Sequence, residues 1–553
     1  MIDFAALTDS ASERKARGAF FTPTEICDFI TSWAVRSFSD RVLEPSCGEA
    51  AFLVSVGERL RALGAVGNTA EQLHGFDQLH GVELHRLSAL HAARATAVRE
   101  MPATVHWGDF FDAHMPGAFD AVVGNPPYVR YQEFTGEARA KGQRAALALG
   151  VPMSGLASSW APFLLHASTF LAPHGRLGLV LPAELLSVNY AAPVRAFLMR
   201  RFAKVRLVLF EERVFPGVIE EVVLLLAEGE GPTDRFTVHQ ARDLADLRDL
   251  ANLTSSWTPR AADDKWVEAL LPSDAATLYS TATTRFEQLQ DWGSTTLGMV
   301  TGNNRYFALG SASVQAAGLG ESDLIRISPP GSRHLRGLSF GDSAWREMAE
   351  TGSRAWLFYP DGERPSAAAS KYIVAGEASN VHHAYKCRVR KPWWRVPMVD
   401  VPHLFLTYMN HDTPRLVNNA AGVPHLNSVH GVRLAAGRQR VGQDLLPIAS
   451  VNSLTVLGAE IVGRSYGGGL LKLEPKEADL LPVPSMALVS ELAGQLRALR
   501  PQLSSALRGG ELLAVLDLVD RALLIEGLGL RRKDVKLLRA ARDAMFARRA
   551  SRG

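Results

Sequence analysis

The chain has 553 residues, of which 47% are hydrophobic and 21% charged, and its formal net charge is only +3. These values predict two or three globular domains with large cores, and any nucleic-acid binding must come from local basic patches. The three cysteines lack metal-ligand spacing, which argues against a metal site. No stretch reaches the ~20 apolar residues of a membrane helix, and the first residues lack the apolar core of a signal peptide, so we expect a cytoplasmic protein.

Two segments near the N-terminus place small or polar residues just before a helix. Thr22 and Pro23 precede an apolar helical pattern, with Thr22 as the expected N-cap. Residues 41–53 read RVLEPSCGEAAFL, which predicts a short strand ending at Glu44, a turn and a helix. This order is typical of α/β nucleotide-binding sheets, although GxGxxG and a P-loop lysine are absent. The small residues of the turn would let a ligand approach the backbone, and Glu44 could accept a hydrogen bond from a ligand ammonium.

The next two predicted strands also end in acidic residues. Residues 80–84 read HGVEL, so Glu83 follows Glu44 by about one βαβ unit, where a carboxylate commonly binds a ribose diol. Residues 104–107 lead to Asp109, which could accept from an adenine amine, and to Phe110, which could cover the adenine face. Because ligands bind at the carboxyl ends of parallel strands, these acids predict a cofactor along that edge.

A fourth predicted strand, residues 119–124, opens into Asn125-Pro126-Pro127-Tyr128. The two prolines fix two φ angles and leave carbonyl groups without a local N–H partner. The turn therefore suits a site that accepts hydrogen bonds from a planar amine and stacks on its ring. The alternative is an ordinary strand-to-loop turn, for which Asn-Pro-Pro is also suitable.

In this order, the Thr-Pro helix, LEPSCGEAAFL, GVEL, GDFF and NPPY resemble the γ-type amino-methyltransferases of DNA, most closely the TaqI-like adenine methyltransferases. The resemblance covers at least residues 18–228 and implies a Rossmann-like class I methyltransferase sheet of the α/β class with S-adenosylmethionine as cofactor. It assigns the cofactor contacts to Thr22, Glu44, Ser46, Cys47 and Gly48 (methionine part), Glu83 (ribose), Asp109 and Phe110 (adenine), and Pro127. For Cys47, the alternative is a small packed thiol.

Residues 205–210 and 221–227 predict an antiparallel hairpin with Phe215-Pro216-Gly217 between the strands. The family places a base-stacking phenylalanine at this Val-Phe-Pro position, which assigns that role to Phe215. The alternative is a ring folded back onto the core.

The resemblance implies methyl transfer to the N6 amine of an adenine that is flipped out of duplex DNA. Tyr128 and Phe215 would stack on the flipped base, at roughly 1–3 kcal/mol per stacked base. The side-chain oxygen of Asn125 and the carbonyl of Pro126 would accept both amine hydrogens and so favour a tetrahedral nitrogen with a localised lone pair. Transfer would then be a direct displacement without a covalent intermediate. The residues alone leave a cytosine amine open, and adenine is expected by resemblance.

The second half has no βα alternation. We expect a methyltransferase domain over residues 1–240, with RFTVHQ (235–240) as its last candidate strand, an α+β target-recognition domain over 241–481 and a helical region over 482–553. Stretches 301–307, 382–397 and 463–475 combine basic and aromatic residues, which predicts DNA contact. The candidate contacts are Arg305, Lys386, Arg388, Arg390, Lys391, Trp393, Arg395, Arg464 and Tyr466. For the tryptophans, the alternative is a buried position in a solvated strand.

Residues 531–553 carry nine Lys and Arg against two acids. This tail would either contact the DNA backbone or a partner, or form a solvated helix. Since the chain starts at the Thr-Pro helix, we expect any nuclease to be a separate protein.

The leading hypothesis is a sequence-specific modification enzyme of a bacterial or archaeal restriction–modification system. Its substrate would be double-stranded DNA, and a cognate restriction endonuclease is a possible partner. The alternatives are a methyltransferase of a protein glutamine amide or of RNA, and a DNA-binding protein without activity.

Overall fold

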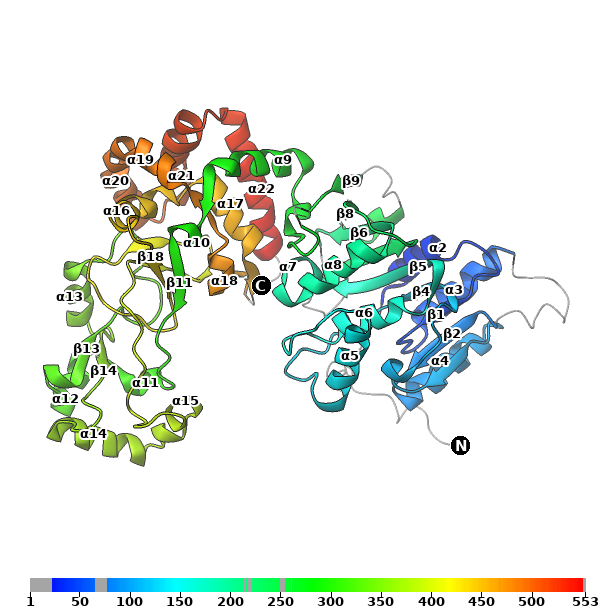
Figure 1. Ribbon diagram of the computed structural model, residues 1–553, viewed down its shortest axis with the longest axis horizontal. Helices are drawn as coiled ribbons and strands as arrows, with labels where there is room; N and C mark the ends of the chain where they lie inside the picture. Colours follow the sequence, from blue (N-terminus) through cyan, green and yellow to red (C-terminus); the bar gives the residue numbers. More distant parts are fainter. Residues whose placement is uncertain are drawn as a thin grey trace. The chain divides into compact units, whose positions relative to one another are not determined.

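The computed structural model describes residues 22–64, 77–212, 214–215, 221–248, 254–259, 261–466 and 468–550. The chain divides into two compact units, residues 1–270 and 271–553 (Figure 1). The boundary therefore lies at residue 270 rather than 240, because the strand at Thr254–Trp257 continues the sheet of the first unit. The expected separate helical region, residues 482–553, belongs to the same unit as residues 271–481.

The first unit is built on a mixed sheet, which in the described part of the chain has nine strands in the order β3-β2-β1-β4-β5-β7-β6-β8-β9. The strands are β1 (Val42–Glu44), β2 (Leu79–Glu83), β3 (Thr104–Trp107), β4 (Phe119–Gly124), β5 (Leu171–Pro182), β6 (Lys204–Phe210), β7 (Val222–Glu228), β8 (Phe236–Ala241) and β9 (Thr254–Trp257). Strands β3, β2, β1, β4 and β5 run parallel, while β7 is antiparallel to β5 and β6. The expected α/β sheet, the β6–β7 hairpin and the strand expected at 235–240 are confirmed, but that strand is not the last one, because β9 follows it.

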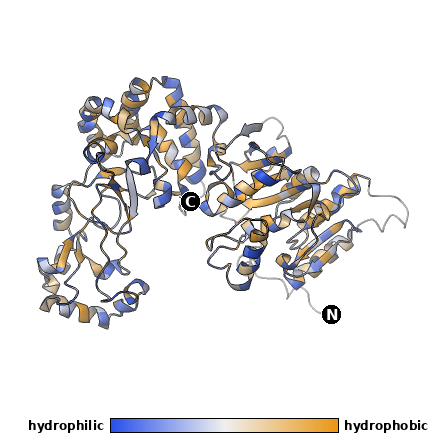
Figure 2. Ribbon diagram, in the orientation of Figure 1, coloured by the Kyte–Doolittle hydropathy of each residue, from blue (hydrophilic) through white to orange (hydrophobic). Residues whose placement is uncertain are grey.

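The helices of the first unit are α2 (Thr24–Ala34), α3 (Ala51–Ala62), α4 (Arg86–Ala97), α5 (Gly136–Ala148), α6 (Trp160–Ser168), α7 (Glu184–Ser187) and α8 (Ala192–Arg201). Strand β4 and the second half of β5 are almost completely buried, and both appear as apolar runs in Figure 2. A parallel strand covered on both faces needs such a run, because neither face meets water. One core cluster joins α2, α3 and the central strands through side chains such as Ile30, Phe52 and Val123.

The second unit combines small sheets with helices. Its strands are β10 (Phe286–Gln288), β11 (Gly293–Leu297), β12 (Ala308–Leu309), β13 (Leu324–Arg326), β14 (Trp356–Phe358), β15 (Leu404–Leu406), β16 (Met409–Asn410), β17 (Leu416–Asn418), β18 (His430–Leu434), β19 (Arg464–Tyr466), β20 (Leu470–Lys472) and β21 (Pro482–Pro484). Its helices are α9 (Ser273–Ala282), α10 (Leu289–Trp292), α11 (Asn304–Phe307), α12 (Ser311–Ala317), α13 (Asp342–Glu350), α14 (Ala367–Ala378), α15 (Tyr385–Arg388), α16 (Gln439–Ala449), α17 (Ser453–Val462), α18 (Pro475–Ala478), α19 (Met486–Glu491), α20 (Ala493–Arg508), α21 (Leu512–Asp520) and α22 (Arg532–Ala550).

Within the described residues, no single helix has the length and apolar composition to cross a membrane. Helices α16 and α17 pass that test only as a pair, which is bent by 92°.

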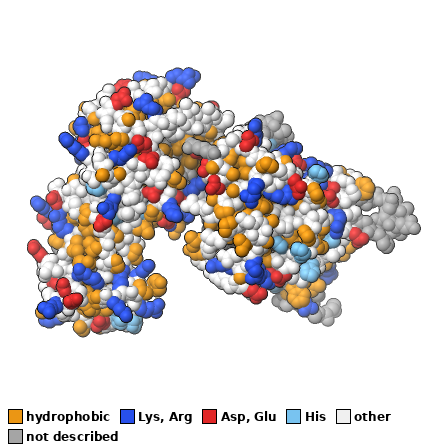
Figure 3. Space-filling view, in the orientation of Figure 1, with side chains coloured by type: hydrophobic (Ala, Val, Ile, Leu, Met, Phe, Trp, Pro, Cys, Tyr) orange, Lys and Arg blue, Asp and Glu red, His pale blue; other side chains and the backbone are white. Residues whose placement is uncertain are grey.

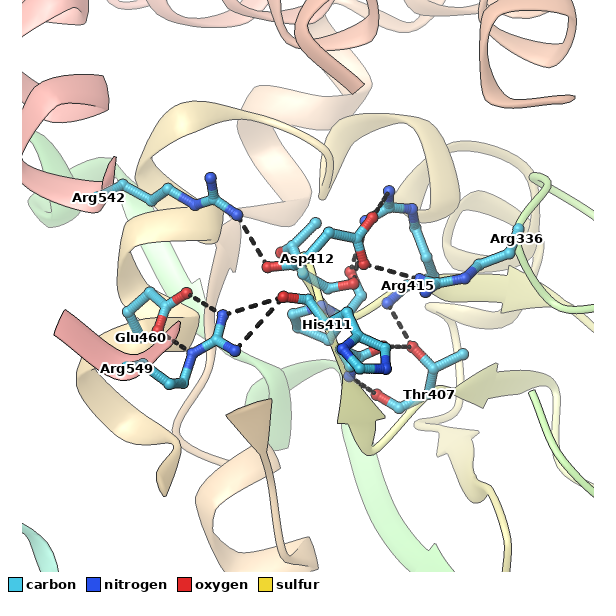
Figure 4. Close-up of polar contacts among 11 residues, drawn as sticks. Arg336, Thr407, His411, Asp412, Arg415, Glu460, Arg542 and Arg549 are labelled. Carbon is cyan, nitrogen blue, oxygen red and sulfur yellow. Dashed lines mark hydrogen bonds and ion pairs between the residues drawn. The ribbon is translucent and has the colours of Figure 1, made fainter. Parts of the chain in front are cut away.

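Helix α22 is held on the second unit by arginines that point inward (Figure 4). Arg549 forms an ion pair with Glu460 of α17, at 2.9 Å between Nη2 and Oε1, and the two side chains are only 4% and 3% exposed. The Arg549 guanidinium also donates to the backbone oxygen of His411 (3.3 Å), and Arg542 donates to that of Asp412 (2.8 Å). A solvated position, one of the expectations for the tail, does not describe these two arginines, whose side chains are 4% and 12% exposed. Contact of the tail with the DNA backbone or with a partner remains a prediction.

The segment that accepts hydrogen bonds from α22, residues 407–415, is also held by Arg336 and by contacts within the segment. The Asp412 carboxylate pairs with Arg336 and Arg415, at 2.9 Å each. Burial raises the pKa of Asp412, but the charges of Arg415 and Arg336 outweigh it and hold the pKa below its ordinary value. The Thr407 hydroxyl accepts from the Arg415 backbone N–H at 2.9 Å. The C-terminal helix therefore belongs to a continuous polar network (Figure 4).

Replacing Arg549 with alanine would leave Glu460 as a buried charge without its ion-pair partner. We expect Arg549→Ala to destabilise the full chain by about 3–5 kcal/mol, as measured by urea unfolding. Lys536 is exposed on the same helix, so Lys536→Ala should change the free energy of unfolding by less than about 0.5 kcal/mol. Equal stabilities of the two variants would contradict the anchoring role of Arg549.

Candidate functional site

Asn125 joins three segments that are far apart in the sequence. Its side-chain nitrogen donates to Oγ1 of Thr22 (3.2 Å), and its backbone oxygen accepts from the Ser46 hydroxyl (3.2 Å). Strands β1 and β4 are neighbours in the sheet, so the turn after β1 lies beside the tetrapeptide. The structure thus brings Thr22, Ser46 and Asn125 together at the carboxyl edge of the sheet, where ligands bind in open α/β folds.

Thr22 reaches Asn125 because it does not cap a helix. Helix α2 begins at Thr24 with Pro23 in the N-cap position, and no side chain makes a capping hydrogen bond there. The prediction that Thr22 is the N-cap is therefore wrong, and its hydroxyl serves the tetrapeptide instead.

The other polar atom of the Asn125 side chain has unused bonding capacity. Oδ1 is buried, and no described residue donates a hydrogen bond to it. A buried acceptor without a donor costs free energy. This geometry therefore fits a site that a donor on a ligand, such as an amine, completes.

Ser159, just before α6, fixes the rest of the tetrapeptide. Its hydroxyl donates to the Pro127 carbonyl and accepts from the Val129 N–H at 2.9 Å, and its own N–H donates to the Val129 carbonyl at 3.0 Å. The backbone is thereby held on both sides of Tyr128, whose ring packs partly against the core. Sequence reasoning missed Ser159, although a serine directly before an apolar helix is a recognisable signal.

The turn after β1 is tied to the tip of β2. The Glu83 carboxylate accepts from the Gly48 N–H (2.9 Å) and from the His85 N–H (2.8 Å). Gly48 has a φ of +48°, which favours glycine, and a Cβ added there would meet no atom within 4 Å. The turn therefore leaves open space in which a ligand can lie against the backbone.

Glu44 and Cys47 are buried beneath this turn. The Glu44 carboxylate, 3% exposed, accepts from the Leu53 N–H in the first turn of α3 (2.9 Å). Burial raises the pKa of Glu44 well above its ordinary value, and the charge of Glu83 adds to this against the Leu53 hydrogen bond. Burial and the charge of Glu44 likewise raise the pKa of the Cys47 thiol, which is 2% exposed. Cys47 thus has the position of a packed thiol.

Asp109 is held by a lysine that the sequence did not single out. One carboxylate oxygen accepts from the Phe111 N–H (3.0 Å), and the other pairs with Lys141 of α5 (3.0 Å). Lys141 also pairs with Asp112 (2.5 Å), and these acidic partners raise its pKa. A carboxylate offers about four acceptor positions, so Asp109 retains capacity for a further donor.

Two predicted stacking rings are buried. Phe110 is 4% exposed and packs against Phe163 and Phe170, with ring centroids 4.7 and 5.1 Å apart. Phe215 is 5% exposed within the core cluster of the first unit. The alternative position expected for Phe215, a ring folded onto the core, is the one observed, and residues 216–220 lie outside the described residues. Tyr128 is the half-buried ring that remains beside Asn125.

Comparison with known proteins agrees with this geometry. Residues 5–253 match the family described as N-6 DNA Methylase, and residues 263–524 match the C-terminal domain of Type II methyltransferase M.Eco57I. Each half of the chain thus resembles a domain of known DNA methyltransferases, the first half the N-6 DNA methylase domain. An adenine-specific DNA methyltransferase with S-adenosylmethionine as methyl donor is therefore confirmed.

Several relatives of this methylase are known. It is 26% identical to Type II methyltransferase M.XamI of Xanthomonas campestris pv. amaranthicola, over 87% of this chain and 88% of the relative. It is 30% identical to M.PaeR7I of Pseudomonas aeruginosa, over 44% and 46% of the two chains. The solved structure of the Type IIL restriction–modification enzyme MmeI in complex with DNA covers 94% of this chain, and this chain covers 75% of MmeI, with a TM-score of 0.57 at 12% identity. The two chains thus share a fold.

The residues at the sheet edge of the methylase fit the chemistry of the cofactor. The ammonium, ribose hydroxyls and adenine amine of S-adenosylmethionine are hydrogen-bond donors. The ends of β2 and β3 offer carboxylates from Glu83 and Asp109, and Gly48 leaves space beside them, while Glu44 is buried beneath the turn.

In the second unit of the methylase, two of the three predicted DNA-contacting stretches form one surface. Gly302 has a φ of +89°, and a Cβ there would lie 3.1 Å from the Cys387 sulfur, so a glycine lets loop 300–305 pack on α15. Arg390 donates to the Thr301 carbonyl (2.8 Å) and to the Val300 carbonyl. The exposed cations of the joined stretches are Arg305, Lys386, Arg388 and Lys391.

Other residues that were predicted to contact DNA instead form contacts with the protein beneath this surface. The Arg395 guanidinium lies 3.7 Å from the centroid of the Tyr359 ring. Trp393 donates its indole N–H to Glu377 (3.0 Å) and packs on the cluster beneath. Like Arg390, these side chains are engaged by the protein, because an arginine or tryptophan offers donors that backbone and acidic groups accept.

The third stretch lies in another sheet, β16-β20-β19. Arg464 pairs with the buried Glu477 (2.7 Å), while Tyr466 is 52% exposed.

The raised pKa of Glu44 predicts a pH-dependent stability. The folded state keeps a proton that an unfolded glutamate loses near pH 4.3, so the free energy of unfolding falls as pH rises from about 4 towards the raised value. Glu44→Gln removes this titration and keeps an acceptor for the Leu53 N–H. In urea titrations of the cofactor-free protein, the variant should gain stability relative to the wild type with rising pH.

The control for this experiment is Glu49→Gln, because Glu49 is exposed on the same turn. The Glu49 variant should follow the wild type at every pH. A Glu44→Gln curve parallel to the wild type would contradict the assignment.

Because Phe215 lies in the core, we expect its replacement to lower the stability of the fold rather than to weaken only the binding of the flipped base. Phe215→Ala should cost about 3–5 kcal/mol in the free energy of unfolding, because it empties a core position. Phe38→Ala, at a ring that is 54% exposed, should cost much less. A Phe215→Ala protein of unchanged stability but reduced DNA affinity would restore the stacking role.

Proposed function

We propose that this chain is the modification enzyme of a restriction–modification system, which methylates N6 of an adenine flipped out of duplex DNA. The observation that carries this proposal is the buried Oδ1 of Asn125, for which no described residue is a donor, at the edge where Thr22 and Ser46 also converge. The match to the N-6 DNA methylase family supports adenine as the target, and the Type II methyltransferases among the relatives support the biological role.

The cofactor would lie along the tips of β1, β2 and β3. The turn at Ser46 and Gly48 would hold its amino-acid end, Glu83 its ribose hydroxyls and Asp109 its adenine amine. Glu44 would act from beneath by holding the first turn of α3, since its carboxylate accepts from Leu53. When bound, S-adenosylmethionine supplies an electrophilic methyl group.

The tetrapeptide would prepare the target nitrogen. Oδ1 of Asn125 and the carbonyl of Pro126 would each accept one hydrogen of the amine, which draws the nitrogen lone pair out of the ring system and toward the incoming methyl group. The bond from Asn125 to Thr22 fixes which side-chain atom faces the amine. Tyr128, between two fixed peptide groups, would stack on the flipped base.

Exposed cations of the second unit would bind the DNA backbone. Arg305, Lys386, Arg388 and Lys391 would neutralise phosphates, which makes the affinity salt-dependent. Because such an enzyme protects chromosomal DNA, we place it in the cytoplasm of a bacterial or archaeal cell. A cognate restriction endonuclease would be its functional partner.

The test is incubation of the full chain with labelled S-adenosylmethionine and duplex DNA, followed by nucleoside analysis. We expect the label in N6-methyladenine. Asn125→Ala should lower kcat about a hundredfold or more, because it removes a preorganised polar contact with the reacting group, and should leave cofactor affinity within about twofold. Asn189→Ala, at an exposed amide of the same unit, is the control.

Three outcomes would count against this proposal. Label in protein or RNA would favour the alternative methyltransferases. A wild-type chain that binds DNA without methylating it would favour an inactive homologue. Full turnover by Asn125→Ala would remove the catalytic assignment of Asn125.

A further inference from the structure

Helix α15 presents an apolar ridge between positive charges. Tyr385 is 65% exposed and Val389, just after the helix, is 62% exposed. The Val389 N–H donates to the Tyr385 carbonyl at 3.4 Å, so the helical turn continues and the two side chains lie on one face. With about 100° per residue, Lys386 and Arg388 lie roughly 80° to either side of that face. Both are exposed, while Cys387 on the opposite side is buried.

The helical turn that carries Tyr385 and Val389 is held in place by contacts on its buried side. The Cys387 thiol donates to the Thr301 carbonyl (3.6 Å), and Arg390 holds the same carbonyl. The close approach at Gly302 brings loop 300–305 against the inner side of α15. Because the opposite side of the helical turn packs against loop 300–305, Tyr385 and Val389 face the solvent.

We propose that this ridge inserts into a groove of duplex DNA, with Tyr385 against the bases and with Lys386 and Arg388 on the phosphates that line the groove. The proposal rests on the proposed function of the chain. An apolar side chain that enters between base steps unstacks them and opens the duplex. Such a distortion would assist extrusion of the target adenine and would make Tyr385 a contributor to site selection.

Charge identifies DNA as the occupant of this surface. Exposed apolar side chains alone would equally suit a protein partner. Here cations flank the ridge on both sides, and Arg305 and Lys391 belong to the same surface. Figure 3 shows Lys and Arg side chains among hydrophobic ones, together with some Asp and Glu side chains, at the end of the second unit that carries α14 and α15. This arrangement matches a polyanion with an apolar interior, which is the chemistry of a DNA groove.

The test measures binding of a short duplex that carries the sequence methylated by the wild type, by fluorescence anisotropy at several salt concentrations. Tyr385→Ala should weaken binding roughly tenfold without changing the slope of log K against log salt. Tyr385→Phe should retain most of the affinity, because the ring remains. Lys386→Gln and Arg388→Gln should each reduce the magnitude of the slope by about 0.9.

A matched control is Leu513→Ala, at a side chain 65% exposed on α21, which should leave affinity and slope unchanged. The proposal is overturned if Tyr385→Ala binds within about twofold of the wild type, or if both glutamine variants keep the wild-type slope. If either result is obtained while the wild type methylates DNA normally, the proposed function still stands. Absence of DNA methylation by the wild type would instead remove the proposed function.

Discussion

Two hydrogen bonds at Asn125 hold the candidate active site together. The bond from its backbone oxygen to Ser46 joins the ends of β4 and β1, and the bond from its side-chain nitrogen to Thr22 adds the segment before α2. In the proposed mechanism, neither of these two atoms contacts the target amine. Oδ1, the acceptor proposed for that amine, remains available while the two hydrogen bonds restrain the rest of the residue. The support of Pro127 and Val129 by Ser159 extends this preorganisation to Tyr128.

The acidic residues at the strand ends likewise use some of their acceptor positions within the protein, while others remain for a ligand. Glu83 holds the turn at Gly48, Asp109 pairs with Lys141, and Glu44 accepts from the start of α3. Each carboxylate stabilises the local backbone or charge balance while Glu83 and Asp109 retain acceptor positions for a ligand. The cluster has an electrostatic cost, because the charge of Glu83 contributes to the raised pKa of Glu44. A ligand that brings a cation and several donors to this edge would offset that cost.

Basic residues in the second unit have two distinct uses. Arg549 and Arg390 point inward and donate to carboxylates or backbone carbonyls, and so they position α22 and loop 300–305. Lys386 and Arg388 remain exposed beside Tyr385. A guanidinium offers several donors in a rigid plane, which makes arginine effective at joining segments of backbone. A basic stretch in the sequence therefore contains both arginines that hold the fold together and cations that are exposed on the surface. Only the tertiary packing shows which residues have which role.

The sequence by itself determined the α/β class, the strands with acids at their tips, the NPPY turn and the likeness to adenine methyltransferases. These features are local: they depend on strand length, on turn residues directly after a strand, and on the order of motifs along the chain. Only the tertiary structure decided that Thr22 bonds to Asn125, that Lys141 holds Asp109, that Phe215 faces the core and that the first unit extends to residue 270. Each of these depends on contacts between residues distant in the sequence, and local periodicity carries no information about such partners.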